Sequence, residues 1–273
     1  MNEAPAWHQD EEFWSAFQEF IFPPEQIEQA TEQVEQLLEL LDVESGATVL
    51  DIPCGVGRHA IELAKRGFEV TAVDATDPYL ETARERADEE TVEIEFLQAD
   101  MREFRRPESF DTIINLYTSF GYFADRADDE RTAQNFYDSL RPDGTLVMSV
   151  TSKEIIAGKF QHRTWDERDG MYILEKHEIQ DDWSWMENRW IIVSDGDLRE
   201  FTVSHRLYSA FELTELLERV GFTETTVYGD LDGADYDGKR ESASSGRSKI
   251  TREVLRRRPS HGAAAATPQW EIR

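Results

Sequence analysis

The spacing of apolar and polar positions changes twice along the chain. Residues 11–41 carry apolar side chains at helical spacing, interrupted by Pro23 and Pro24, which predicts two amphipathic helices. Between residues 46 and 151, short apolar runs alternate with helical segments of roughly ten residues, which is the pattern of βαβ units. Residues 152–208 then alternate apolar with polar positions, which predicts antiparallel strands.

The middle region predicts an α/β fold with a doubly wound, mostly parallel sheet, because strands that are joined through helices pair in parallel. Local signals mark its helices, such as Gly67 after the first helix and Pro78 at the start of the second. The expected strands span 48–52, 69–73, 93–97, 112–116 and 145–150, and the expected helices span 58–66, 78–87 and 128–140.

We expect one domain over residues 1–237. Its parts would be a helical cap at 1–45, a ligand-binding core at 46–151, an antiparallel lid-like insert at 152–208 and a return to the core at 209–237. Strands of the insert are predicted at 171–176, 188–193 and 200–208, in a segment that holds Trp165, Trp183, Trp185 and Trp190. The return would hold a helix from the capping box Ser209–Glu212 to Val220, and a strand at 225–228.

Charge separates the last segment from the rest of the chain. The chain has 57 acidic and 29 basic residues, a formal net charge of −28. Residues 238–273 are low in complexity and hold nine basic residues against three acidic ones, so we expect a disordered basic tail with one short helix over 248–257. Residues 1–237 therefore carry −34, a field that repels nucleic acids and anionic membranes.

Composition limits the remaining classes of protein. Hydrophobic residues make up 39% of the chain and no apolar run approaches the length of a membrane span, so we expect a folded protein without a membrane segment. The N-terminus lacks the features of a secretion signal, and 23 arginines to 6 lysines on an acidic chain resemble cytoplasmic proteins of salt-accumulating halophiles. Cys54 is the single cysteine and the six histidines lack metal-ligand spacing, so no disulfide, no metal and a cytoplasmic location are expected.

The strongest candidate chemistry lies where the first two predicted strands end. The stretch Val49–Gly57 leads from a strand into a turn with Gly55 and Gly57, where a ligand can approach the backbone closely. Asp74 ends the next strand, a position from which an acid can bond ribose hydroxyls. Ala60 stands where a dinucleotide motif has its third glycine and is a permitted variant, so this motif alone leaves NAD open.

Further polar groups stand at the ends of the other predicted strands, namely Asp51, Asp100 and Asn115. The carboxyl ends of parallel strands meet in one crevice, where open α/β sheets bind ligands. With these positions the sequence resembles the class I S-adenosylmethionine-dependent methyltransferases, which implies their Rossmann-like fold and S-adenosylmethionine as the cofactor. The resemblance covers about residues 45–150, through the stretches Val49–Gly57, Val70–Ala75, Gln98–Met101 and Phe110–Phe123.

The resemblance implies a role for each matching residue. Asp51 and the turn from Cys54 to Gly57 would hold the methionine moiety, and the Asn115 carbonyl would face its ammonium group. Asp74 would bond the ribose. Pro53 replaces the usual first glycine of the family's motif, and because proline lacks an N–H, contact at that position must use other atoms.

At the other end of the cofactor, Asp100 would bond the adenine amino group. Met101 would pack on the adenine ring, and Ala75 would lie beside it.

The segment after the fourth strand bears on the methyl acceptor. It lacks the paired prolines of methyltransferases that act on DNA bases or glutamine amides, which together with the charge of −34 indicates a small molecule. The residues expected to wall the acceptor pocket are Trp14, Tyr117, Phe120 and Tyr122, since a tyrosine face can attract the sulfonium. No general base is identified, and His177 and His205 of the insert are the weak candidates.

We therefore expect methyl transfer from S-adenosylmethionine to a small-molecule acceptor by in-line displacement, with the protein orienting and desolvating the reactants. A nicotinamide-dependent oxidoreductase on the same sheet is one alternative, and the segment 110–123 argues against it. A non-catalytic S-adenosylmethionine-binding protein is the other, and no feature of the sequence excludes it.

The end of the sheet is unusual for this family, whose sheets usually close with a hairpin of two antiparallel strands. No second apolar run follows 225–228, and composition and charge both switch near Asp237. We hypothesise that the native final strand has been replaced, for example by a shift of reading frame. An exposed sheet edge would favour association, so the oligomeric state stays open between a monomer and a homodimer.

Overall fold

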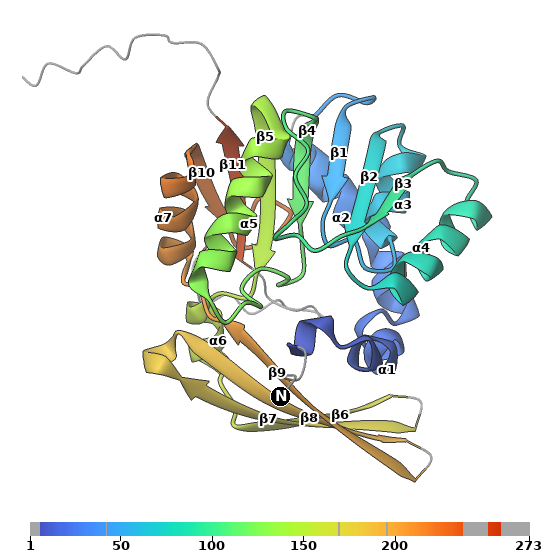
Figure 1. The fold of residues 1–273 in the computed structure, drawn as a ribbon, viewed down its shortest axis with the longest axis vertical. Helices are drawn as coiled ribbons and strands as arrows, with labels where there is room; N and C mark the ends of the chain where they lie inside the picture. The colour runs from blue at the N-terminus through green and yellow to red at the C-terminus, as the bar shows by residue number, and fades with distance from the viewer. Residues whose placement is uncertain (1–5, 42, 169, 195, 237–250, 258–273) are drawn as a thin grey trace, which may run out of the picture.

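The computed structural model describes residues 6–41, 43–168, 170–194, 196–236 and 251–257. These residues form a seven-stranded main sheet flanked by helices, and a separate four-stranded insert sheet (Figure 1). The predicted α/β fold, with a mostly parallel main sheet, an N-terminal helical segment and an antiparallel insert, is confirmed.

The main sheet has the strand order β10-β11-β5-β4-β1-β2-β3. The strands from β5 to β3 run parallel, whereas β11 is antiparallel to both of its neighbours. Because the parallel strands share one direction, the carboxyl ends of β1, β2 and β4 meet at one edge. The strands of this sheet are β1 (Thr48–Asp51), β2 (Glu69–Asp74), β3 (Glu95–Gln98), β4 (Phe110–Asn115), β5 (Leu140–Val150), β10 (Phe222–Tyr228) and β11 (Thr251–Arg257).

Helices cover both faces of the main sheet and bury its apolar side chains. Helices α2, α3 and α4 pack on one face through residues such as Val34, Leu63 and Leu80. Helices α5 and α7 pack on the other face through Phe136 and Leu216. These helices are α2 (Pro24–Leu41), α3 (Arg58–Lys65), α4 (Asp77–Glu89), α5 (Arg126–Ser139) and α7 (Ala210–Val220). Among the described helices, none is long and apolar enough to cross a lipid bilayer.

The helix ends follow the local signals in the sequence. The predicted capping box at the start of α7 is present, since Ser209 accepts from the backbone of Glu212 while the Glu212 carboxylate accepts from the backbone of Ser209. Asp10 and Asp125 cap α1 and α5 in the simpler way, by accepting backbone N–H groups of the first turn.

The insert sheet has four antiparallel strands, one more than predicted. Its strands are β6 (Arg163–Arg168), β7 (Met171–Gln180), β8 (Trp185–Ser194) and β9 (Asp197–Arg206), with α6 (Lys153–Lys159) before them and η2 (Asp181–Trp183) between β7 and β8. The sequence analysis missed β6 because this segment, Arg-Thr-Trp-Asp-Glu-Arg, carries no apolar alternation; it becomes a strand by pairing with β7 along its length.

The N-terminal segment joins the two sheets. The short helix η1 (Trp7–Gln9) and helix α1 (Glu11–Ile21) lie between the insert sheet and the main sheet (Figure 1). Phe13 and Phe17 of α1 are buried, and their rings lie 5.5 and 4.9 Å from those of Phe201 and Trp190 in the insert. Each such burial contributes roughly 1.5–3 kcal/mol, so α1 holds the insert against the core.

The main sheet contains a final strand that the sequence analysis did not predict. Strand β11 lies between β10 and β5 and pairs with both. The predicted short helix over 248–257 is therefore wrong where the chain is described, at residues 251–257, and the sheet domain does not end at residue 237. Strand β11 fills that place in the sheet, so the hypothesis that it replaced a native strand stays a prediction, which reading the gene in the adjacent frames would test. The rest of the predicted disordered tail, 238–250 and 258–273, lies outside the described residues.

Residues 251–257 form a strand because of their neighbours in the sheet and not because of their composition. Backbone N–H and C=O groups of β11 find partners on two neighbouring strands, so the sheet satisfies them whatever the composition of the segment. Local composition, which is rich in arginine here, carries no trace of that pairing.

Candidate active site

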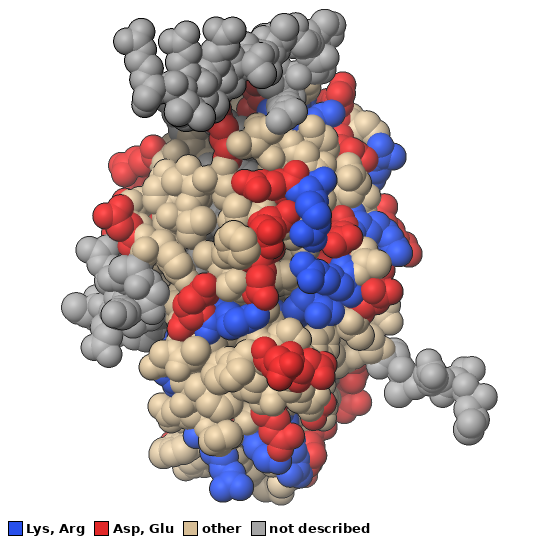
Figure 2. Space-filling view, turned by 90° about the vertical axis from the view of Figure 1, so that its left-hand side faces the viewer, with Lys and Arg blue, Asp and Glu red and all other residues tan. Residues whose placement is uncertain are grey.

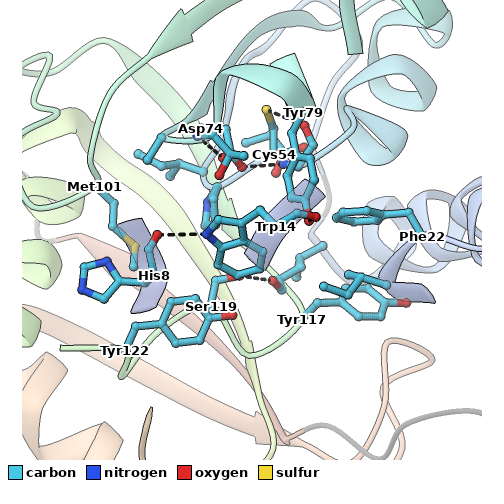
Figure 3. A pocket seen from close by; sticks show the side chains of 18 of the residues that line it. His8, Trp14, Phe22, Cys54, Asp74, Tyr79, Met101, Tyr117, Ser119 and Tyr122 are labelled. Carbon is cyan, nitrogen blue, oxygen red and sulfur yellow. Dashed lines mark hydrogen bonds between the residues drawn. The ribbon is translucent and has the colours of Figure 1, made fainter. Parts of the chain in front are cut away.

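A cavity of about 470 Å³ lies where the carboxyl ends of the parallel strands, helix α1 and insert strand β8 meet. This volume falls in the range of small-molecule sites, roughly 300–1,000 Å³. Most of the site residues expected from the sequence line it (Figure 3). They are Trp14, Asp51, Cys54, Gly55, Asp74, Ala75, Asp100, Met101, Tyr117 and Tyr122.

Three expected site residues lie beside the cavity without lining it. Gly57 caps the start of α3 with φ +71°, and a Cβ there would lie 3.0 Å from that of Ala83, so it permits close packing of α4. Asn115 is buried, and its side-chain amide donates to the Ile52 carbonyl at 2.7 Å, tying β4 to the end of β1. Phe120 is buried in the main hydrophobic core.

Asp51 ends β1 and is 1% exposed. Among the described residues, its Oδ2 atom has no hydrogen-bond partner. Burial raises the pKa of Asp51 to about 8, although the nearby Arg58 charge opposes the change. The end of β1 therefore offers the cavity a buried acceptor atom that a ligand donor can satisfy.

Asp74 shapes the turn that follows β1. Its carboxylate accepts from the backbone N–H of Gly55 and of Thr76, each at 2.8 Å, and burial raises its pKa. Gly55 has φ +54°, and a Cβ there would lie 2.7 Å from the ring of Phe22. Asp74 therefore holds the glycine turn close to the end of β2, and only glycine fits the turn.

Asp100 is engaged by a neighbouring arginine. Its carboxylate forms an ion pair with Arg102 at 2.6 Å, and Arg102 also pairs with Asp128 at 3.2 Å. Burial alone would raise the pKa of Asp100, but hydrogen bonds from the side chain and backbone of Arg102 lower it. Asp100 is thus an ionised acceptor, and a ligand amino group would share it with Arg102.

The structure adds aromatic and imidazole groups that the sequence did not indicate, among them His8, Phe22, Tyr79 and Trp190. The Trp14 indole donates to the His8 carbonyl at 2.9 Å, and Tyr79 donates to the Trp14 carbonyl at 2.9 Å. Figure 3 shows Trp14 between these neighbours. Tyr79 follows the end of β2 by a few residues, a spacing that could have indicated it; the others come from distant elements and leave no local signal.

The insert, which the sequence predicts to be lid-like, contributes one of its four tryptophans to the lining of the cavity. Trp190 lines the cavity, but Trp165 and Trp183 are 67% and 37% exposed at the surface. The aromatic cover therefore consists of α1 residues together with Trp190.

The two histidines considered as bases lie in the insert and do not line the cavity. His177 contacts the side chains of Asn188 and Thr164 at 2.6 and 2.9 Å. Burial, aided by the charge of His177, lowers the pKa of His205 to about 4. His8 and His59 both line the cavity, and burial lowers the pKa of His8, so its imidazole is neutral near pH 7. Among the described residues no cluster of histidine, cysteine and acidic side chains suits a metal ion.

Comparison with known proteins agrees with this geometry. A family model described as a methyltransferase domain matches residues 49–144. YqeM of Bacillus subtilis is 29% identical over 71% of this chain and 80% of its own length. A glycine/sarcosine N-methyltransferase of Halorhodospira halochloris is 32% identical over 68% of this chain and 69% of its own length.

The fold also matches solved structures. An S-adenosylmethionine-dependent methyltransferase from Clostridium acetobutylicum superposes with a TM-score of 0.73 at 14% identity, over 90% of this chain and 98% of that one. These findings favour a methyltransferase over a nicotinamide-dependent oxidoreductase, and the strand-end cavity lies where such enzymes bind their nucleotide ligand. The chain therefore belongs to the class I S-adenosylmethionine-dependent methyltransferases, and S-adenosylmethionine is its cofactor.

Proposed function

We propose that the enzyme transfers the methyl group of S-adenosylmethionine by in-line displacement to a small-molecule acceptor inside the strand-end cavity. The observation that carries this proposal is the convergence, on one cavity, of a glycine turn, two buried strand-end acids and several aromatic side chains. The relatives point the same way, since their named acceptors include glycine, sarcosine and an amino sugar.

The residues of the cavity fit the cofactor. The unpartnered Asp51 Oδ2 is an acceptor for the methionine ammonium group, and the bare backbone at Gly55 leaves room for the chain that carries it. Asp74 would bond the ribose hydroxyls through carboxylate oxygens that also accept from the backbone of Gly55 and Thr76. Met101 and Ala75 would flank the adenine, with Asp100 as acceptor for its amino group.

When bound, the cofactor supplies a methyl group activated by a sulfonium charge. The chain's own residues orient the partners and exclude water, which is the main demand of a displacement between two bound molecules. Tyr117, Tyr122 and Trp14 offer aromatic faces that attract a cation. Burial raises the pKa of Tyr122 to about 12, so its phenol stays protonated and can donate a hydrogen bond.

The size and charge of the molecule favour a small acceptor. Residues of α1 and Trp190 of β8 line the cavity together with the strand ends, and its volume suits a small molecule. Acidic and basic side chains are interspersed on the face that Figure 2 shows, and residues 1–237 carry −34, which disfavours nucleic acid. The resemblance of its acidic, arginine-rich composition to cytoplasmic proteins of halophiles supports a location in the cytoplasm, which fractionation of the source cells would test.

Calorimetric titration tests the proposal most directly. We expect wild type to bind S-adenosylmethionine and S-adenosylhomocysteine in buffer with molar KCl, and NADH not at all. Asp74→Asn should weaken both at least tenfold, whereas Asp88→Asn, an exposed acid on α4, should leave them unchanged. Absence of binding to wild type would refute the proposal. Binding without turnover on a panel of small amines, acids and phenols would favour a non-catalytic binding protein.

A further inference from the structure

We propose that Arg58 is the anion receptor of this cavity and that its guanidinium binds a ligand carboxylate that lies next to an ammonium group. The inference rests on the proposed function and assigns one end of the ligand. Such an α-amino-acid end has two sources here, the methionine moiety of S-adenosylmethionine and an amino-acid acceptor.

Arg58 is the first residue of α3 and reaches into the cavity. It is 3% exposed, and the side chain lies over the Tyr117 ring, with the guanidinium carbon 3.8 Å from the ring centroid. One guanidinium N–H donates to the Gln26 carbonyl at 2.9 Å. Because Gln26 and Tyr117 both line the cavity, these contacts hold the cation at its wall.

The contacts of Arg58 with Gln26 and Tyr117 satisfy only part of its guanidinium group. Among the described residues Arg58 forms no salt bridge, and its remaining N–H groups have no protein partner. The position is also unfavourable for a cation, because the start of a helix carries the positive end of its dipole. A buried, unpaired guanidinium is costly, so its presence indicates a negative partner that arrives with the ligand.

The other cations near the cavity are already satisfied. Arg102 is paired with Asp100 and Asp128, and Arg86 lies outside the lining and donates to the Val56 carbonyl. Arg58 is the one arginine or lysine among the residues that line the described cavity.

Asp51 supplies the complementary half of the receptor. Its unpartnered Oδ2 and the unpaired Arg58 line the same cavity without forming an ion pair with each other. Burial raises the pKa of Asp51, so without ligand the acid holds its proton near neutral pH and leaves the Arg58 charge uncompensated. When a ligand ammonium group binds, Asp51 would release its proton to solvent, and the ammonium group on Asp51 with a carboxylate on Arg58 would then satisfy both residues.

Calorimetry with the whole cofactor and with a fragment of it tests the assignment of Arg58. The probes are S-adenosylmethionine and 5′-methylthioadenosine, which shares the adenosine and sulfur but lacks the amino-acid end. Arg58→Met keeps an apolar stem without the charge, Arg58→Lys keeps the charge without the fork, and Arg105→Met on the exposed surface is the matched control. Glycine and acetate titrated into the enzyme loaded with S-adenosylhomocysteine probe an acceptor carboxylate.

If Arg58 binds the methionine carboxylate, Arg58→Met should weaken S-adenosylmethionine about 10- to 100-fold and leave 5′-methylthioadenosine within twofold, with Arg58→Lys between them. If it binds an acceptor carboxylate, glycine and acetate should lose affinity while S-adenosylmethionine does not. The midpoint of thermal unfolding without ligand should stay equal or rise in Arg58→Met, because a buried unpaired charge is removed.

Two results would overturn the assignment while leaving the proposed function intact. One is equal weakening of both adenosine ligands, which would mean that Arg58 only shapes the cavity. The other is no change in any of the four probes. Failure of wild type to bind S-adenosylmethionine would instead refute the proposed function itself.

Discussion

Replacing Asp51 by asparagine should change how the stability of the ligand-free enzyme depends on pH. Asp51 is 1% exposed at the end of β1, and its Oδ2 has no hydrogen-bond partner among the described residues. Asparagine has nearly the same shape but cannot ionise. The substitution therefore removes the titration of this group with little change in packing.

The sign and size of this pH dependence follow from the shifted pKa of Asp51. Burial raises the pKa of Asp51 from its ordinary 3.8 to about 8. At a pH between these two pKa values, Asp51 of the folded protein holds a proton that the unfolded chain has released. The contribution of protonated Asp51 to stability is therefore fully present below pH 3.8 and is lost as the pH rises through about 8. Between pH 3.8 and about 8, the free energy of unfolding changes by up to −1.4 kcal/mol per pH unit, or about 6 kcal/mol in total. Water in the cavity reduces this sum, and we expect about 2–3 kcal/mol.

Urea unfolding followed by tryptophan fluorescence at pH 5, 6, 7 and 8 measures the effect. The free energy of unfolding of Asp51→Asn relative to wild type should rise with pH by that amount, whereas Asp88→Asn should run parallel to wild type. Asp129, whose burial raises its pKa to about 6, titrates in both proteins and cancels. A difference that stays constant within about 0.5 kcal/mol across this range would refute the reasoning.

Three further substitutions test other parts of the structure. Gly55→Ala should destabilise the protein by about 1–2 kcal/mol and weaken S-adenosylmethionine in calorimetry, because φ is +54° and the new Cβ would meet Phe22; unchanged affinity would count against the glycine turn as the binding site. Phe17→Ala should cost about 3–5 kcal/mol in chemical unfolding, since Phe17 is fully buried between α1 and the insert; a loss below 1 kcal/mol would show that α1 does not hold the insert. Asp129→Asn should cost about 3 kcal/mol in thermal unfolding, because Asp129 is buried and pairs with Arg206 at 3.1 Å, and an unchanged midpoint would contradict this.

The local sequence determined the elements of the parallel core. Short apolar runs ended by polar residues gave strands, and caps such as the Ser209–Glu212 box gave helix starts, because these signals act within a few residues of the chain. The strand ends were also predictable. Asp51 and Asp74 each end a parallel strand, and the geometry of a parallel sheet then brings them to one edge.

Residues that reach the cavity from distant elements were harder to predict. His8, Phe22 and Trp190 belong to the N-terminal segment and the insert, and nothing in their neighbours shows that they face the ends of β1 and β2. Phe120 shows the converse, since it stands at an expected position but its side chain packs in the hydrophobic core. Which side of an element faces a cavity depends on contacts across the whole fold.

Only the tertiary structure determines that β11 is a strand and that the Arg58 side chain is buried in the cavity wall. β11 is a strand because β10 and β5 satisfy its backbone groups on both sides, an interaction between segments that are far apart in the sequence. Arg58 directly follows the glycine turn in the sequence. Its proposed role as an anion receptor comes from its burial without an acidic partner among the described residues. Local sequence sets backbone preference over a few residues, whereas pairing, burial and unsatisfied charge exist only once distant segments have packed together.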